Sequence, residues 1–318
     1  MKYIVSWGVH IIVIENLLMM NSCILLIGRH ISPFELSIFY SRNLRKTCNI
    51  CAGARNSSIA TFTVQEKKIN VNGININHVI TGEGNHPVLL LPGALGSVWT
   101  DFKPQLENLD KTKLTLVAWD PPGYGKSRPP DRTFPENFFE RDACYAHDLM
   151  TTLRFSKFSL IGWSDGAITS LILAAKNPQN VQKLILLAAN SYISPEEMKI
   201  YKGIMNIDTW SERMRAPLLA MYGEDYFRKT WKAWVMAMMK LYEKNNGDIC
   251  KKIVSQIQSP TMIIHGSRDV IVAAEHPIYL RENILNSKLK IFENGGHNLH
   301  LRYHEEINKI ILEFLTDN

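Results

Sequence analysis

The chain has 318 residues, of which 46% are hydrophobic and 21% are charged. This composition is typical of a globular protein and excludes a disordered, collagen-like or low-complexity chain. The formal net charge is +6, and residues 1–60 account for +4 of it because they carry six basic and two acidic side chains. A nucleic-acid partner would need a basic stripe on the folded part of the chain. The remaining sequence has no such stripe, so we expect no nucleic-acid binding.

Residues 1–58 differ from the rest of the chain, and we exclude them from the predicted fold. Residues 3–28 are largely apolar but contain Glu15 and two asparagines, so they are a poor match to a membrane span of about 20 apolar residues. Residues 29–58 carry Arg and Ser with a single acid, a composition that resembles organelle transit peptides. We expect mitochondrial targeting, with a secretory signal or anchor, or a cytoplasmic location, as the alternatives.

Five cysteines in a chain of this length do not form a disulfide framework. Cys48 and Cys51 form a C-x-x-C pair, but no second pair and no neighbouring histidine accompany it. We therefore expect no metal site. Cys144 and Cys250 are expected to be buried thiols.

From residue 59 to residue 318 the sequence alternates short apolar runs with helical patterns, and we treat this stretch as one domain. The expected strands are 62–71, 74–81, 86–91, 114–119, 157–161, 181–188, 261–265 and 288–292. The expected helices are 136–155, 165–177 and 300–316. Asn72-Gly73 predicts a hairpin between the first two strands. The alternation that follows predicts an α/β fold with a mostly parallel, doubly wound, eight-stranded sheet, whose active site would lie at the carboxyl ends of the strands.

Residues 194–258 interrupt this alternation with a helical pattern and no strand pattern. They hold seven of the 12 methionines and three tryptophans: Met198, Met205, Met214, Met221, Met236, Met238, Met239, Trp210, Trp231 and Trp234. Flexible methionines suit a surface that adapts to varied ligands, so we expect a helical lid over the site. The alternative is a pair of helices that only packs on the sheet.

The residues Gly162–Gly166 read G-W-S-D-G, a G-x-S-x-G motif between a predicted strand and a predicted helix. This context is the one that the motif requires, because the sharp turn presents the hydroxyl of Ser164 at a helix N-terminus. A serine nucleophile needs a base, and the base needs an orienting acid. His297 and Asp269 each follow a predicted strand. We therefore expect Ser164, His297 and Asp269 to form a catalytic triad.

Other residues compete for these roles. His300 lies three residues beyond His297 and is expected to be structural, while His265 lies inside a strand and is expected to be buried. An acid could instead follow the preceding strand, but Asn190 and Ser191 stand there. This leaves Asp269 as the candidate.

An oxyanion needs two backbone N–H donors. We expect one from Asp165, which follows the nucleophile, and the other from Ala94 or Leu95 in the loop after the strand 86–91. The sequence leaves the choice between Ala94 and Leu95 open because only the backbone takes part. The glycine-rich stretch Asp120–Ser127 lacks the spacing of a phosphate-binding loop, so we interpret it as a turn held by hydrogen bonds of Asp120.

Together these motifs resemble the α/β-hydrolase fold family over about residues 62–316, through D-P-P-G-Y-G-K-S, G-W-S-D-G, G-S-R-D and G-G-H-N-L-H-L. Within that family the resemblance implies a serine hydrolase of α-amino acid esters, with mitochondrial placement in relatives. Pro122 departs from the pattern, since relatives tend to carry Arg there, and residues 1–58 are unfamiliar.

Asp165 bears on the substrate, because its carboxylate lies beside a site that must stabilise an oxyanion. Two unit charges about 7 Å apart at an effective dielectric of about 20 repel by roughly 2–3 kcal/mol, or about fifty-fold in rate. A bound α-ammonium group would offset this repulsion. Asp165 is therefore expected to bind the ammonium group of the substrate, the alternative being a carboxylate that points into solvent.

We expect a monomeric enzyme that acts on a small-molecule ester bearing an α-ammonium group, without metal or organic cofactor. The alternatives on the same fold are a general carboxylesterase, a thioesterase or lactonase (including a thiolactonase), and a carbon–carbon bond hydrolase. A noncatalytic ligand-binding protein is a further alternative from a different class. The sequence leaves open the physiological substrate, the leaving group and the mature N-terminus.

Overall fold

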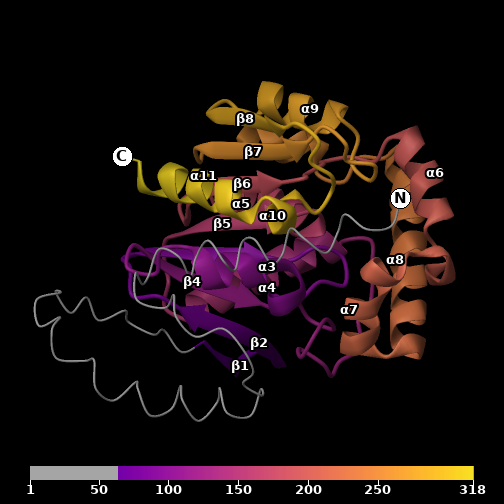
Figure 1. Ribbon diagram of the computed structural model, residues 1–318, viewed down its shortest axis with the longest axis horizontal. Coiled ribbons are helices and arrows are strands. Elements are labelled where there is room, and N and C mark those ends of the chain that lie inside the picture. Colours follow the sequence, from indigo (N-terminus) through magenta and orange to yellow (C-terminus); the bar gives the residue numbers. More distant parts are fainter. Residues whose placement is uncertain (1–63, 318) are drawn as a thin grey trace, which may run out of the picture. The chain divides into compact units, whose positions relative to one another are not determined.

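The structure is a computed structural model that describes residues 64–317 (Figure 1). The predictions for residues 1–58 and for the Cys48–Cys51 pair lie outside the described residues.

An eight-stranded sheet forms the centre of the described chain, with the strand order β1-β2-β4-β3-β5-β6-β7-β8. The strands are β1 (Gln65–Val71), β2 (Ile74–Thr81), β3 (His86–Leu91), β4 (Leu114–Trp119), β5 (Phe158–Trp163), β6 (Val181–Leu187), β7 (Thr261–Gly266) and β8 (Ser287–Phe292). The pairs β1–β2 and β2–β4 are antiparallel, and the other neighbours are parallel. This mostly parallel sheet confirms the predicted fold class.

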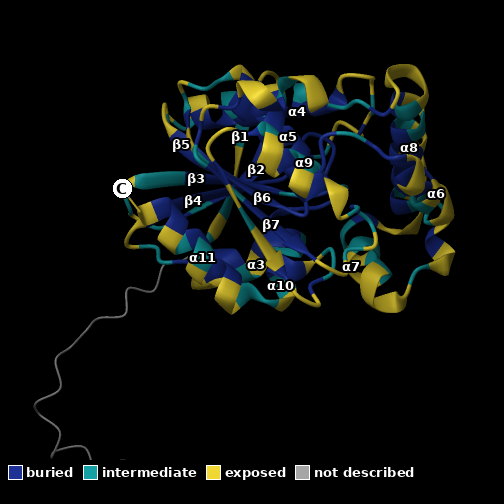
Figure 2. Ribbon diagram, turned by 90° about the horizontal axis from the view of Figure 1, so that it is seen from above, coloured by how far each residue is buried: buried dark blue, intermediate teal, exposed yellow. Residues whose placement is uncertain are grey.

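Helices cover both faces of the sheet, which explains why its central strands are apolar along their length. In Figure 2, α4, α5 and α9 lie on one face and α3, α10 and α11 lie on the other. Their bounds are α3 (Val98–Asn108), α4 (Phe138–Thr152), α5 (Asp165–Lys176), α9 (Glu275–Asn283), α10 (Leu299–Arg302) and α11 (His304–Thr316). The two faces form two apolar cores, one containing Leu171 of α5 and the other containing Phe102 of α3 and Ile311 of α11.

The stretch between β6 and β7 is helical, as the sequence predicts. It contains α6 (Pro195–Gly203), η1 (Ile207–Thr209), α7 (Glu212–Tyr222), α8 (Glu224–Asn245) and η2 (Lys251–Gln256). Helices α6, α7 and α8 gather at one end of the sheet (Figure 1). Tyr222 of α7 donates a hydrogen bond to the carbonyl of Leu95, which follows β3. These helices therefore contact loops at the carboxyl ends of the strands, while their opening as a lid stays a prediction.

Three local predictions differ from the structure. The sequence does not predict α3, whose interior Pro104 weakens the helical pattern, or α9, a short helix whose apolar residues do not line one face. The expected helix 300–316 is interrupted at Tyr303, which separates α10 from α11. Cys144 is exposed, contrary to the expectation of a buried thiol, because it lies on the solvent side of α4.

Candidate active site

Ser164 lies in a sharp turn between β5 and α5. Its backbone has φ 54° and ψ −121°, a strained combination for a residue with a Cβ. The turn needs small neighbours, because a Cβ on Gly166 would lie 2.0 Å from the carbonyl oxygen of Leu91, and one on Gly162 would lie 2.4 Å from that of Gly166. The Gly-x-Ser-x-Gly spacing therefore allows α5 to approach the sheet closely while the hydroxyl is held at the helix N-terminus.

The structure brings together the three side chains of the predicted triad. Nε2 of His297 lies 3.0 Å from the Ser164 hydroxyl oxygen, and Nδ1 of His297 lies 2.8 Å from Oδ2 of Asp269. His297 comes from the loop after β8 and Asp269 from the loop after β7. The Asp269 side chain is fully buried, whereas the His297 side chain is 15% exposed. The imidazole is therefore open to a ligand while its acid partner is shielded from solvent.

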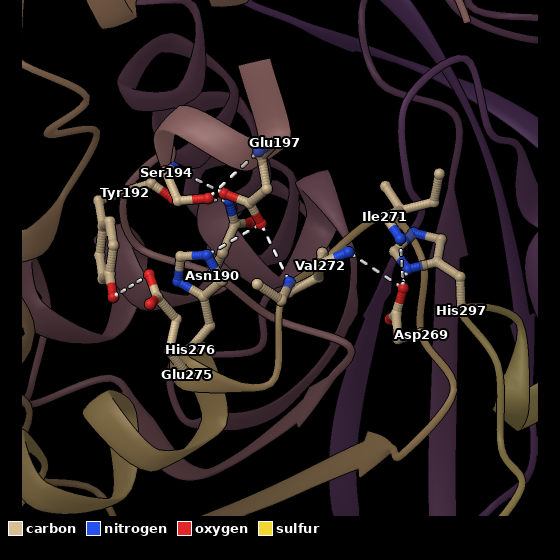
Figure 3. Close-up of polar contacts among 11 residues, drawn as sticks. Asn190, Tyr192, Ser194, Glu197, Asp269, Ile271, Val272, Glu275, His276 and His297 are labelled. Carbon is tan, nitrogen blue, oxygen red and sulfur yellow. Dashed lines mark hydrogen bonds and ion pairs between the residues drawn. The ribbon is translucent and has the colours of Figure 1, made fainter. Parts of the chain in front are cut away.

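Asp269 is held ionised by its neighbours. Burial raises its pKa, but His297 and the backbone N–H groups of Val272 and Ile271 outweigh burial, so the pKa of Asp269 lies below its usual value. Both amides donate to Oδ1, at 3.0 and 2.9 Å (Figure 3). Because an ionised carboxylate only accepts, Nδ1 of His297 carries the hydrogen. In the neutral ring Nε2 is then free to accept the proton of Ser164.

Trp163 fixes the loop that carries His297. Its indole N–H donates to the carbonyl of His297 at 2.9 Å, and its ring packs between His297 and His300. His300 is fully buried and its Nε2 lies 2.8 Å from the backbone oxygen of Asp101. Burial lowers the pKa of His300 to about 3, so the ring is neutral and structural, as expected.

Hydrogen bonds shape the loop Pro92–Gly96 and leave two of its backbone N–H groups without an acceptor. The N–H of Gly93 donates to Oδ2 of Asp101, and the Leu95 carbonyl accepts from Tyr222. Among the described residues, the amides of Ala94 and Leu95 have no backbone or side-chain acceptor. The same holds for Asp165 at the first position of α5. These are the three donors that the sequence predicts, and the choice between Ala94 and Leu95 stays open.

Asp120 holds the turn that follows β4, as predicted. Its carboxylate accepts from the amide of Val98 at 2.8 Å, from the side chain of Asn77 at 2.9 Å and from the amide of Lys126 at 2.7 Å. Because these bonds occupy both oxygens, the residue fixes the loop rather than binding a ligand.

Asp165 faces the helical insertion rather than open solvent. Its Oδ2 accepts a 2.7 Å hydrogen bond from the indole of Trp234 in α8. Burial raises the pKa of Asp165 to about 7, although the Trp234 hydrogen bond and the nearby Arg132 guanidinium oppose the rise. Arg132 lines the same small cavity and forms a buried ion pair with Asp142. Near neutral pH, Asp165 is therefore present in both its ionised and its neutral form.

Neither Trp163 nor Trp234 could be assigned from the sequence, because each reaches its partner across the fold. Residues 64–317 contain no cluster of three or more His, Cys, Asp or Glu side chains that could hold a metal ion. Within the same residues, no helix combines the length and apolar character needed to cross a membrane.

Comparison with known proteins agrees with this architecture. The family model for the alpha/beta hydrolase fold matches residues 86–200 and 188–302. A human relative, Serine hydrolase BPHL, is 49% identical over 253 residues, which cover 80% of this chain and 87% of the relative. A relative from Pseudomonas putida, 2-hydroxy-6-oxononadienedioate/2-hydroxy-6-oxononatrienedioate hydrolase 2, is 26% identical and covers 74% of this chain and 89% of its own.

Among solved structures, the meta-cleavage product hydrolase CumD from Pseudomonas fluorescens IP01 superposes with a TM-score of 0.65. It is 18% identical and the match covers 78% of this chain and 96% of that one. At this level of identity the likeness concerns the fold alone.

Proposed function

Because this chain belongs to the α/β-hydrolase fold family, we propose that it is a serine hydrolase of α-amino acid esters that works through Ser164, His297 and Asp269. One observation carries the proposal: a continuous line of contacts runs from Asp269 through His297 to the Ser164 hydroxyl, with separations of 2.8 and 3.0 Å. A base oriented in this way can deprotonate a serine at neutral pH.

In the first half of the reaction, Nε2 of His297 takes the proton of Ser164 while the hydroxyl oxygen attacks the ester carbonyl. The amide of Asp165 and that of Ala94 or Leu95 donate to the oxyanion. The intermediate then collapses, the carbon–oxygen bond to the alcohol breaks, and the alcohol leaves with the proton from His297. Ser164 is left esterified by the amino acid.

In the second half, His297 takes a proton from water, and the resulting hydroxide attacks the acyl group. Collapse returns the proton to Ser164 and releases the amino acid. Asp269 keeps Nδ1 protonated throughout and stabilises the imidazolium that forms twice in each cycle. The residues named here supply every proton transfer.

The charge of Asp165 favours an amino-substituted acyl group. The α-ammonium group is one carbon away from the attacked carbonyl, so it reaches the residue that follows the nucleophile. It offsets the repulsion between the carboxylate and the oxyanion that would slow a neutral ester. The runs Val117–Pro122, Phe138–Asp142 and His297–Arg302 also resemble valacyclovir hydrolase, the biphenyl hydrolase-like protein, which supports the same substrate class.

The test is a panel of paired esters that differ only in the α-amino group. Ser164→Ala should lower kcat/KM for every ester by about 10⁴-fold or more. Asp165→Asn should lower kcat/KM for amino-esters about fifty-fold, because the ammonium group loses an attraction of roughly 2–3 kcal/mol to the carboxylate. It should not lower kcat/KM for des-amino esters, whose oxyanion no longer meets the charge of Asp165. Equal losses for both members of a pair would refute the ammonium role but not the hydrolase.

A carbon–carbon bond hydrolase is a second candidate because of the 26% identical Pseudomonas putida relative, whose name describes a hydrolase of 2-hydroxy-6-oxo acids. A dianionic substrate of this kind would be repelled by an ionised Asp165, which favours the ester. Including such a substrate in the panel separates the two functions, and labelling of Ser164 by a fluorophosphonate separates either from a noncatalytic binding protein. The mitochondrial location and the monomeric state also stay proposals.

A further inference from the structure

Glu197 is a buried acid that the proposed mechanism does not use. It belongs to the first turn of α6, in the helical insertion, and contacts a histidine in α9, His276. Both side chains have 0% exposure, and Nε2 of His276 lies 2.9 Å from Oε1 of Glu197. The aromatic ring of Tyr192 packs on His276 with 4.3 Å between centroids. Burial of a charged carboxylate is unfavourable unless its oxygens are well paired.

The two oxygens of Glu197 serve two different segments. Oε2 accepts a 2.8 Å hydrogen bond from the amide of Ser194, which completes the N-terminal cap of α6. Oε1 accepts a 3.2 Å hydrogen bond from the amide of Ala273, which lies 76 residues away in the loop after β7. A helix cap requires only the first bond, and an exposed glutamate could supply it. The second bond joins the insertion to the loop that carries Asp269.

Three consecutive amides of that loop are divided between the two acids (Figure 3). Ile271 and Val272 donate to Asp269, and the next amide, that of Ala273, donates to Glu197. A change in the orientation of the Ala273 amide would move the peptide unit before it and with it the donor of Val272. Glu197, which belongs to the helical insertion, thus holds the Ile271–Ala273 turn in place. That turn supplies both backbone donors to Asp269.

We propose that Glu197 is a positioning residue for the reaction, acting through the Ile271–Ala273 turn to keep the Asp269 carboxylate aligned with His297. The inference rests on the proposed triad, since it assigns Glu197 a role in one of its arms. The ring of His276 lies against the same oxygen, with Nε2 2.9 Å from Oε1, although neither ring nitrogen makes a hydrogen bond. The helical insertion therefore contributes to the acid arm of the site as well as covering it.

The test compares Glu197→Gln with Glu196→Gln, a matched control in the same helical turn whose side chain is exposed. Glutamine preserves the shape of Glu197 but cannot accept at both positions. We expect Glu197→Gln to lower kcat about tenfold, with little change in KM, for amino and des-amino esters alike. The acidic limb of the pH profile of kcat/KM should move to lower pH, because a displaced carboxylate stabilises the imidazolium less. The control should change neither quantity.

A double-mutant cycle with Asp269→Asn shows whether the effect passes through Asp269. In the Asp269→Asn background, adding Glu197→Gln should lower kcat little further than Asp269→Asn alone, because the carboxylate that Glu197 positions is already lost. An equal loss of kcat in both backgrounds, or an acidic limb of the pH profile that does not move in Glu197→Gln, would overturn the proposal. If Glu197→Gln does not fold, Glu197→Asp keeps the charge but shortens the reach, and the same pH shift is expected.

A measurement without substrate separates failure of this inference from failure of the proposed function. The proton between Nδ1 of His297 and Asp269, which are 2.8 Å apart, should give a far-downfield NMR resonance. Glu197→Gln should shift or broaden it, and Glu196→Gln should leave it in place. An unchanged resonance contradicts the positioning role even in an enzyme whose substrate is not an ester, whereas a shifted resonance with no ester turnover contradicts only the proposed function.

Discussion

Asp165 has to satisfy two opposed requirements, because it must be ionised to bind an ammonium group and yet it lies beside a developing oxyanion. Burial raises its pKa to about 7, and the indole of Trp234 and the charge of Arg132 act in the opposite direction. Near neutral pH, a part of the Asp165 side chains is therefore ionised and the rest is protonated. Selectivity for amino-esters should consequently change with pH around 7.

The first prediction concerns Trp234. In the unmodified enzyme the ratio of kcat/KM for an amino-ester to that for its des-amino partner should rise with pH through about 7, as Asp165 ionises. Trp234→Phe removes the donor that stabilises the charged form, so the pKa of Asp165 should rise and the increase in the ratio should move to higher pH. Kinetics with paired amino and des-amino esters from pH 5 to pH 9 would measure the pH at which this ratio increases in each enzyme.

Trp231→Phe is the matched control for that experiment. Trp231 lies in the same helix and stacks on Trp234, but its indole donates to the carbonyl of Ile204. It should leave the position of the pH transition unchanged. A transition that moves equally in both variants would show that packing, and not the hydrogen bond to Asp165, determines the effect.

The second prediction concerns Asp101, which supports the loop with the two candidate oxyanion donors. Burial raises the pKa of Asp101 to about 7, although bonds from Thr100 and Gly93 oppose the rise. An acid whose folded-state pKa is raised favours the folded state below its unfolded pKa and loses that stabilisation as the pH rises through the folded value. Asp101 should therefore destabilise the protein increasingly between about pH 4 and pH 7.

Asp101→Asn can keep the bond from Gly93 and carries no charge. It should raise the free energy of unfolding at pH 8 by up to about 4 kcal/mol and have no such effect at pH 4. Denaturant unfolding at both pH values measures this difference. The exposed Asp131→Asn is the control, and a gain for Asp101→Asn that is equal at the two pH values would contradict the assignment.

At the scale of elements, the position of Ser164 depends on how closely α5 approaches β3. The third prediction is that Gly166→Ala destabilises the protein by about 3 kcal/mol and abolishes turnover, because its Cβ would overlap the backbone of Leu91. Gly203→Ala is the control, since no atom lies within 4 Å of a Cβ there. Urea unfolding of the two variants measures the difference, and equal stabilities would contradict a contact-limited turn.

The success of sequence-based prediction also differs between elements. All eight strands are expected near their observed positions. The buried strands β3 and β4 are continuous apolar runs that end before Pro92 and Asp120, whereas the more exposed β1 and β2 are indicated by the Asn72-Gly73 turn between them. Helix α3 is not predicted because Pro104 and a polar face obscure its periodicity, although its capping residues Ser97 and Thr100 indicate its start.

The candidate site shows the same division. Ser164, Asp269 and His297 are each predicted from a local signal, a strand end followed by a chemically suitable residue. Trp234 and Glu197 are not, because each reaches its partner from the insertion across 69 and 76 residues. Nothing in the neighbouring sequence specifies which of several tryptophans or glutamates makes such a contact, since that depends on how the helices pack.

At the scale of the whole molecule, the described fold contains all of the proposed catalytic and binding residues. The strands and helices from β1 to α11 extend from Gln65 to Thr316, and the first 60 residues carry most of the net charge. The fourth prediction is that a chain beginning at residue 59 folds and hydrolyses amino-esters with kcat/KM within about twofold of the full chain, because the chain from Thr61 onward forms one compact unit with apolar cores of its own. Paired kinetics and thermal unfolding of the two chains measure this. A shortened chain that unfolds at a lower temperature, or that loses selectivity while keeping its turnover of des-amino esters, would show that the first 58 residues contribute to the domain and would argue against their assignment as a targeting segment.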